Sequence, residues 1–266
     1  MLKLFKNTEL PEIEYRAIDA ISQSALRQYA LSPTPLHYWF QSQIEIKKTS
    51  AMELGILLHS RLEMGDSYLN THIPIPKDIR KGTKAYKEFK EIYKEKTLVK
   101  YKDWHLIDSM YRSIKEHSGA SKLLAEGFAE ESFVGELDGI KVKGRIDFRN
   151  PKLKVIVDLK SAITGNPFDV KGFSKIVKDS KYDWQTAFYL EAIKRITGEE
   201  YVFIFLSVEK QYPYACSLHA LSNQDLDAAH QEVFECLHDF NSRKLRNDWG
   251  RGYGSEIHIL NIRGSF

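Results

Sequence analysis

An aspartate and a lysine stand two positions apart at the end of an apolar run in the middle of the chain. The β-branched run over 155–157 is typical of a strand buried on both faces, and Asp158 and Lys160 follow it. Because side chains alternate along a strand, these two are expected to point the same way, about 6.6 Å apart. A carboxylate in an apolar strand is costly unless it is paired or holds a metal ion, so Asp158 has either a structural or a chemical role.

A second aspartate, Asp147, lies on the preceding predicted strand. The turn dipeptides at 138–139 (Asp-Gly) and 150–151 (Asn-Pro) bound a strand expected over 140–148, and the next strand is expected over 153–160. Strands joined by so short a turn pair with each other in an antiparallel ladder. Asp147 is therefore expected to lie beside the second strand.

The register between these strands decides what the two aspartates can do together. With a two-residue turn, Ile156 is expected opposite Asp147, which makes Asp158 the diagonal neighbour of Asp147 on the same face. Two interpretations stay open at this point. In one, Asp158 forms a salt bridge with Lys160 or Arg145 at the strand end. In the other, the two carboxylates and the ammonium form a site for a divalent cation.

The composition is that of an ordinary globular protein. The 266 residues are 42% hydrophobic and 28% charged, and the formal net charge of +3 is weak evidence for a nucleic-acid partner. We expect one domain over 1–266, with a helical N-terminal part over about 20–127 and a polar, lysine-rich surface excursion over about 65–103. A charge run of this kind is usually a solvated face.

The sequence also bears on the compartment. No run reaches the ~18 apolar residues of a membrane span, and the first ten residues lack the apolar core of a signal peptide. Cys216 and Cys236 are too few and too far apart for a zinc or iron–sulfur motif or a disulfide framework. We therefore expect a cytoplasmic protein with no membrane partner.

Two predicted helices carry polar side chains beside an apolar stripe. The helix over 51–64 places Gly55 and His59 four positions apart, and a later helix places Gln185 and Tyr189 in the same relation. Glycine inside a helix costs roughly 1 kcal/mol relative to alanine, so Gly55 indicates that something approaches the helix closely beside His59. The alternative for His59 is a core histidine bonded to a backbone carbonyl.

The order of the expected elements indicates an α/β fold with a mixed central sheet. Helices come first, followed by a three-strand meander, a helix, two strands and a last helix. Glu131 lies on the first strand of the meander, over 130–137, and faces either the aspartates or solvent. A long loop is expected over 161–181, and loops of this length are often functional.

Several short segments occur in the order and approximate spacing of the PD-(D/E)xK nucleases, in particular of their RecB-like branch. They are Gly55 with His59, 144–147 (Gly-Arg-Ile-Asp), 158–160 (Asp-Leu-Lys) and 185–189 (Gln-Thr-Ala-Phe-Tyr). The segments 21–26, 32–33 and 54–59 resemble more narrowly the exonuclease VIII (RecE) group of phage recombination nucleases. The resemblance covers about residues 21–208, and the acid before the lysine is Asp where many relatives have Glu.

The resemblance implies a restriction-endonuclease-like core and a Mg²⁺-dependent deoxyribonuclease in which Mn²⁺ can substitute for Mg²⁺. Hard divalent cations prefer oxygen ligands, lower the pKa of bound water and neutralise developing charge on a phosphate. The implied ligands are Asp147, Asp158 and the Leu159 carbonyl, with His59 as a further ligand and Glu131 on a metal-bound water.

The resemblance also implies roles around the metal ligands. Lys160 would orient the attacking water or stabilise the transition state. Gln185 and Tyr189 would position Lys160 or the scissile phosphate. Arg145 and Lys143 would contact DNA phosphates, which positions the strand without reading its sequence.

The implied activity is exonucleolytic hydrolysis of linear double-stranded DNA with free ends, in phage-type recombination. The family further implies a single-strand-annealing partner and a ring-like homo-oligomer. One alternative is a structure- or site-specific endonuclease of the same superfamily, which would share the metal site. The other is a non-catalytic nucleic-acid-binding module, which the intact Asp147, Asp158 and Lys160 argue against.

Overall fold

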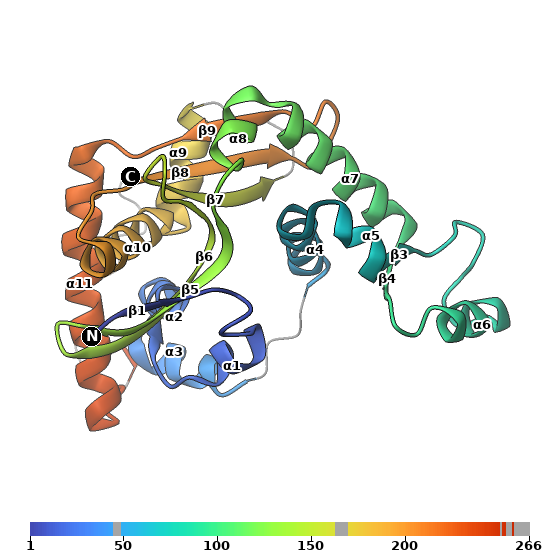
Figure 1. Cartoon of the computed structure of the whole chain (residues 1–266). Helices are drawn as coiled ribbons and strands as arrows, with labels where there is room; N and C mark the ends of the chain where they lie inside the picture. Colours follow the sequence, from blue (N-terminus) through green and yellow to red (C-terminus); the bar gives the residue numbers. More distant parts are fainter. Residues whose placement is uncertain (45–48, 163–169, 251, 254–256, 258–266) are drawn as a thin grey trace, which may run out of the picture.

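A computed structural model describes residues 1–44, 49–162, 170–250, 252–253 and 257 of the chain. Within these residues, seven strands form one sheet with the order β1-β5-β6-β7-β8-β9, and β2 pairs with β6 (Figure 1). The strands are β1 (Lys3–Phe5), β2 (Ile21–Ser22), β5 (Phe128–Leu137), β6 (Ile140–Asn150), β7 (Val155–Ala162), β8 (Val202–Glu209) and β9 (Cys216–His219). The β7–β8 pair is parallel and the β5–β6 and β6–β7 pairs are antiparallel, so the prediction of a mixed sheet is confirmed.

Helices cover both faces of this sheet (Figure 1). Those packed on one face are α2 (Gln23–Leu31), α10 (Tyr182–Thr197) and α11 (Asn223–Arg246), and those on the other are α4 (Ser50–Met64) and α7 (Tyr101–Glu116). Each layer buries its own apolar cluster, and β7 contributes Ile156 to one and Val157 to the other. The strand that carries Asp158 is therefore buried on both faces, as its β-branched run predicts.

The remaining helices are shorter. They are α1 (Glu12–Ala17), α3 (Pro35–Ser42), a 3₁₀ turn (Gly65–Ser67), α5 (Tyr68–Thr71), α6 (Lys84–Ile92), α8 (Ser118–Leu123) and α9 (Val170–Asp179). The α9 helix occupies part of the loop predicted over 161–181, so that prediction is wrong for this part; residues 163–169 lie outside the described residues. None of the described helices is long and apolar enough to cross a membrane.

The β5–β6 hairpin has the register that its turn dipeptide predicts. Asp138 and Gly139 both have positive φ angles, 49° and 77°, as a two-residue type I′ turn requires. Leu137 therefore pairs with Ile140, and the ladder extends back to Phe128. This hairpin fixes which residues of β5 face the chemistry-bearing residues of β6.

The register between β6 and β7 differs from the prediction by two residues. Phe148 pairs with Val157, so the next position brings Asp147 opposite Asp158 and not opposite Ile156. The turn spans four residues, 151–154, and the Asn150 side chain stabilises it by accepting a hydrogen bond from the Leu153 backbone N–H at 3.0 Å. A shift of two residues preserves the face of every side chain, so the aspartates become direct rather than diagonal neighbours.

The predicted surface excursion contains an arm that projects from the body of the protein (Figure 1). Its base is closed by a separate pair of parallel strands, β3 (His72–Pro74) and β4 (Thr97–Val99), and α6 lies at its tip. The segment just before β3 belongs to the body, because the Tyr68 side chain is 1% exposed and packs against Trp104. We call residues 75–103 the basic arm.

Candidate metal-binding site

Three carboxylates lie in a row across strands β5, β6 and β7. The register of the first hairpin aligns Glu130 with Asp147, and the second ladder ends at Phe148 and Val157, next to Asp147 and Asp158. Asp147 lies between the other two acids: the charge of Glu130 acts on Asp147, and the charge of Asp147 acts on Asp158. Glu130 has a φ of 53°, in the left-handed region, and the ladder is interrupted at this residue. Pairing resumes at Ala129 and Phe148, so the ladder is broken only where these two acids lie.

The aspartates are held by the backbone and by side chains of α10. The Asp147 carboxylate accepts a hydrogen bond of 2.8 Å from the Leu159 backbone N–H, in place of a strand-to-strand bond. Asp158 is 2% exposed and accepts a 2.6 Å bond from the Gln185 amide. The Lys160 ammonium lies 2.7 Å from the other Asp158 oxygen and donates to the Gln185 carbonyl at 3.1 Å. Gln185 thus fixes Asp158 and Lys160 relative to each other.

Tyr189 lies one turn beyond Gln185 on α10 and is nearly fully buried. Its hydroxyl lies next to the Arg145 backbone, and its ring meets that of Phe133 edge-on at 5.4 Å. Burial raises the pKa of Tyr189 well above its usual value, and the nearby charges of Asp147 and Asp158 add to this effect. Tyr189 therefore holds β6 against α10 close to the carboxylates.

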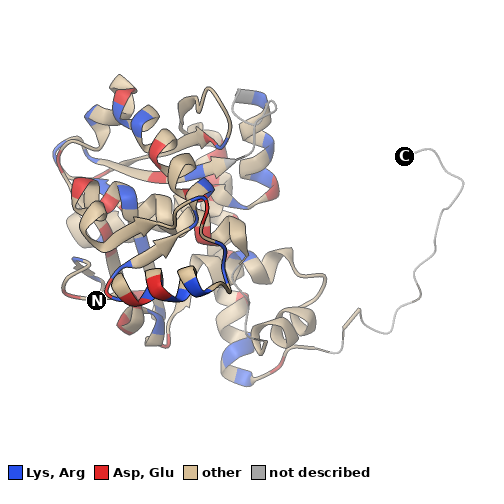
Figure 2. Ribbon diagram, turned by 90° about the vertical axis from the view of Figure 1, so that its right-hand side faces the viewer, with Lys and Arg blue, Asp and Glu red and all other residues tan. Residues whose placement is uncertain are grey.

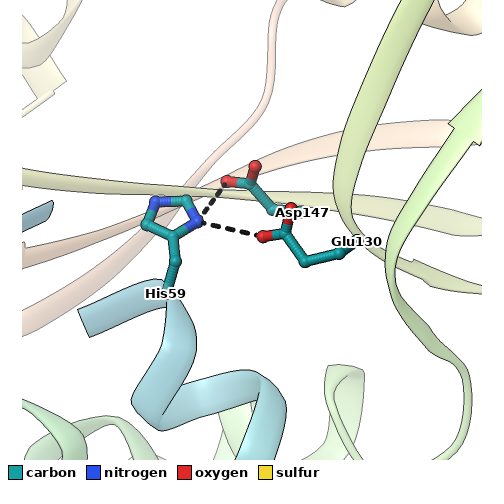
Figure 3. A group of neighbouring side chains, drawn as sticks. All are labelled: His59, Glu130 and Asp147. Carbon is teal, nitrogen blue, oxygen red and sulfur yellow. Dashed lines mark ion pairs between the residues drawn. The ribbon is translucent and has the colours of Figure 1, made fainter. Parts of the chain in front are cut away.

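His59 reaches the carboxylates from α4, on the other side of the sheet (Figure 3). Its Nδ1 lies 3.7 Å from Asp147 Oδ2 and 3.6 Å from Glu130 Oε1. The ligand atoms of His59, Glu130 and Asp147 all lie within 4.8 Å of one another. The α4 helix begins at the N-cap Thr49, whose side chain accepts from the Met52 N–H, and buried leucines on its inner face hold it against the sheet.

Burial and crowding of negative charge set the protonation of the cluster. Burial raises the pKa of Asp158 to about 6, with Asp147 adding to the shift and the Lys160 ammonium opposing it. Burial also raises the pKa of Asp147. For His59, burial disfavours the charged form, but the charges of Asp147 and Glu130 outweigh it and raise the pKa to about 9. The pKa of Lys160 is raised because Asp158 and Asp147 outweigh its burial.

The donor set fits a divalent cation. Glu130, Asp147 and Asp158 supply three negative charges against the ammonium of Lys160 and, when protonated, the imidazolium of His59. Raised carboxyl pKa values in a buried site indicate negative charge that the surrounding protein does not fully balance. A cation bound by these oxygens and by a neutral imidazole would supply that balance, and carboxylates suit Mg²⁺ and Mn²⁺.

The prediction that Glu131 joins this site is wrong. Its side chain is 4% exposed and forms two hydrogen bonds with the Arg149 guanidinium, at 2.7 and 3.2 Å, while Arg149 also donates to the Tyr201 hydroxyl. Neighbours on a strand point to opposite faces, so Glu131 turns away from the face that Glu130 shares with Asp147. The sequence could have predicted Glu130 instead, because counting back along both strands from the turn at 138–139 aligns Glu130 with Asp147.

The two basic residues predicted to contact DNA serve the fold instead. The Lys143 ammonium donates to three backbone carbonyls, those of Tyr15, Arg16 and Ile18, at 2.8–3.1 Å. Arg145 bonds Ser132 and the Leu10 carbonyl and pairs with Glu12 at 3.0 Å. Both side chains fasten the N-terminal segment to β6, so the prediction of phosphate contacts is wrong for both.

A known protein structure shares this fold. A protein from Eubacterium rectale assigned as an exonuclease superposes with a TM-score of 0.62 at 20% identity, over 91% of this chain and 85% of that one. A phage-related exonuclease from Haemophilus somnus 129PT is similar over 86% of this chain and 96% of that one, at 15% identity and a TM-score of 0.39. No curated protein sequence matches the chain.

The family comparison covers most of the chain. Residues 22–251 match the PDDEXK-like domain of unknown function (DUF3799). This range includes every residue of the carboxylate row, together with His59, Lys160 and Gln185. The narrower exonuclease VIII (RecE) group stays a prediction. The chain therefore belongs to the DUF3799 family of PDDEXK-like domains, within the PD-(D/E)xK nuclease superfamily.

Proposed function

We propose that the protein is a metal-dependent DNA exonuclease that hydrolyses phosphodiester bonds of linear double-stranded DNA, in phage-type recombination. The observation that carries the proposal is the row of Glu130, Asp147 and Asp158, joined by His59 and faced by the Lys160 ammonium. Among groups at least partly buried, such an excess of acid over base indicates a function rather than a contribution to stability.

The residues that would hold the metal are Asp147, Asp158, Glu130, His59 and the Leu159 carbonyl. A divalent cation there would lower the pKa of a water molecule and neutralise charge on the phosphate. A cavity of about 210 Å³ reaches His59, Glu130 and Asp147, so these ligand atoms are accessible from one side. Glu130 takes the place that Glu131 was expected to fill.

Lys160 would act on the phosphate through its charge. The charges of Asp158 and Asp147 raise the pKa of Lys160 in the metal-free protein, which favours its ammonium form. Its hydrogen bond to Gln185 and its ion pair with Asp158 hold it next to the carboxylate row. From there it can hold a water molecule or stabilise the negative charge of the transition state. Tyr189 supports this arrangement by fixing β6.

Exonuclease activity is favoured over endonuclease activity by the description of the Eubacterium rectale protein as an exonuclease. The two activities share one metal site, so substrate form must separate them. The single-strand-annealing partner, the homo-oligomer and the cytoplasmic location stay predictions, since they rest on the resemblance alone.

The test is digestion of linear duplex DNA and of a covalently closed circle with Mg²⁺, with labels placed separately at the 5′ and 3′ ends of the linear molecule. We expect release of label from one end, no release in EDTA and an intact circle. Cutting of the circle at the rate of the linear duplex would favour the endonuclease. Absence of divalent-dependent hydrolysis of either substrate would contradict the proposed function.

A further inference from the structure

The basic arm concentrates the positive charge of the chain. Between residues 75 and 103, ten Lys and Arg stand against five Asp and Glu, a formal charge of +5, whereas the whole chain carries +3. The rest of the protein is therefore slightly acidic. Figure 2 views the molecule from the side on which the arm projects, with Lys and Arg in blue. Charge separated in this way produces a local positive field that a polyanion would meet first.

Much of this charge is not balanced within the protein. Lys84 and Lys94 lie 3.7 Å from glutamates of α6, in exposed ion pairs that contribute little to the free energy of folding. Lys77, Lys87 and Lys90 are exposed, and no acidic group of the described residues lies within 4.0 Å of their ammonium groups. Among the same described residues, no hydrogen bond or ion pair ties α6 to the body of the protein.

The surface of the arm is hollowed on both sides of Tyr86. One hollow, of about 470 Å³, is lined by four lysines, including Lys87 and Lys90, by Tyr86 and Tyr93, and by one acid. The other, of about 560 Å³, is also lined by four lysines and one acid, together with Tyr86 and Tyr101. Tyr86 is half-buried and forms a wall of both. The arm therefore presents two concave basic surfaces with an aromatic ring between them.

We propose that the basic arm binds single-stranded DNA, with its lysines on the phosphates and its tyrosine rings against the bases. Proteins that bind single strands without sequence preference combine a basic groove with aromatic side chains on which bases stack. A duplex offers only its phosphates to such hollows, because its bases are paired and stacked inside. The ammonium groups suit the phosphates, and the tyrosines suit unpaired bases.

The inference rests on the proposed function for the origin of the strand. An exonuclease that degrades one strand of a duplex leaves the other strand single, and this product would be available to the arm. Binding itself requires neither the carboxylate row nor a metal ion. It can therefore be measured in EDTA, where hydrolysis does not occur.

The test is fluorescence anisotropy of a labelled oligothymidylate and of a labelled duplex of equal length, in EDTA, over a series of salt concentrations. Lys87→Ala/Lys90→Ala/Lys94→Ala removes three charges that line one hollow. The matched control, Lys3→Ala/Lys122→Ala/Lys141→Ala, removes three exposed charges elsewhere. We expect the arm variant to lower the slope of log affinity against log salt by about 2, since each phosphate contact to a single strand contributes about 0.7. The control should keep the wild-type slope.

A second variant separates single-strand binding from duplex binding. Tyr86→Leu keeps the charge and apolar volume but removes the ring, and should weaken oligothymidylate binding about fivefold or more while leaving duplex binding unchanged. Equal slopes for the arm variant and its control would overturn the proposal. Tighter binding of duplex than of oligothymidylate, with no effect of Tyr86→Leu, would overturn it in favour of a duplex contact. Arm-dependent binding by a protein that hydrolyses no DNA would leave this inference standing and remove the proposed function.

Discussion

Two clusters of acids and bases lie side by side in this fold, one buried and one partly exposed, and adjacent residues of β5 supply one acid to each. Glu131 meets Arg149 through two hydrogen bonds, and Tyr201 takes a further guanidinium N–H. Glu130 joins Asp147 and Asp158, with His59 and Lys160 close to them. Glu63 and Lys115 line the same cavity as Glu130 and Asp147. The first cluster balances one charge with one charge, and the second gathers more acid than base.

The comparison distinguishes a structural ion pair from a site whose acids require a further positive charge, such as a bound cation. In the first cluster the carboxylate and the guanidinium are hydrogen-bonded to each other, and their mutual attraction offsets the free-energy cost of removing both charges from water. In the second, burial raises the pKa of Asp158 to about 6, and Asp147 adds to this shift; the charges of Asp147 and Glu130 raise the pKa of His59 to about 9 against its burial. Changes in the two clusters should therefore affect different properties: activity in one and stability in the other.

The largest effect is expected from the carboxylates on β6 and β7. Asp147→Asn or Asp158→Asn should lower divalent-dependent hydrolysis of linear duplex by about 10³-fold or more, since a lost metal costs several kcal/mol of transition-state stabilisation. The melting temperature should stay close to that of the wild type, because burial already disfavours ionised Asp158. Hydrolysis rates and thermal melting measure the two effects. Near-normal turnover by either pure variant would remove the site assignment.

The structural cluster should show the opposite behaviour. Glu131→Ala leaves the Arg149 guanidinium buried without its carboxylate and should lower the free energy of unfolding by about 3–5 kcal/mol. Hydrolysis per folded molecule should remain close to that of the wild type. Denaturant unfolding measures the loss, and Glu131→Ala/Arg149→Met is the matched variant, which should recover much of it. A stable Glu131→Ala protein with no activity would mean that the two clusters had been assigned the wrong way round.

Glu130 tests the comparison at the neighbouring position. Glu130→Gln keeps the size of the side chain and removes a charge from the acid-rich cluster, so the Mn²⁺ concentration for half-maximal hydrolysis should rise about 10–100-fold. Unfolding free energy should change little, since the Glu130 side chain is partly exposed. Metal titrations of hydrolysis give the shift. An unchanged metal requirement would exclude Glu130 as a ligand.

The smallest expected effect is in the pH dependence of metal binding. Because the metal-free protein raises the pKa of His59 to about 9, the imidazole is protonated at pH 7 and must lose its proton to act as a ligand. Affinity for Mn²⁺ should therefore rise about tenfold per pH unit from pH 7 toward pH 9 and flatten above it. Calorimetry in buffers of different ionisation enthalpy should detect one released proton. His59→Ala should remove this dependence, and an equal slope in that variant would exclude His59.

The sequence predicted the strands of the site well because their signals are local. The Asp-Gly turn at 138–139 determined the first hairpin, and the β-branched run of β7 predicted burial on both faces. The second register was wrong because the Asn150 side chain stabilises a longer turn, and Lys154 takes a φ of 54° that no pattern signals. A register shift of two residues leaves every side chain on its predicted face, so Asp147 and Asp158 are still neighbours.

Contacts between distant segments were harder to predict. His59 reaches Asp147 only through the packing of α4 on the sheet, and its position followed from the resemblance rather than from periodicity. Lys143 was expected to be free for DNA, but its partners are carbonyls of the N-terminal segment, which carries no periodic pattern. Glu131 was chosen over Glu130 although the hairpin register could have decided between them.

The most direct test of the account is Mn²⁺ binding to the DNA-free protein, measured by calorimetry at pH 8. The account predicts binding by the wild type, and by Glu131→Gln in its folded form, with loss of that binding in Asp147→Asn. It places the ligand set in the cluster with excess acid and none of it in the balanced cluster. Equal Mn²⁺ affinity in the wild type and Asp147→Asn would contradict it.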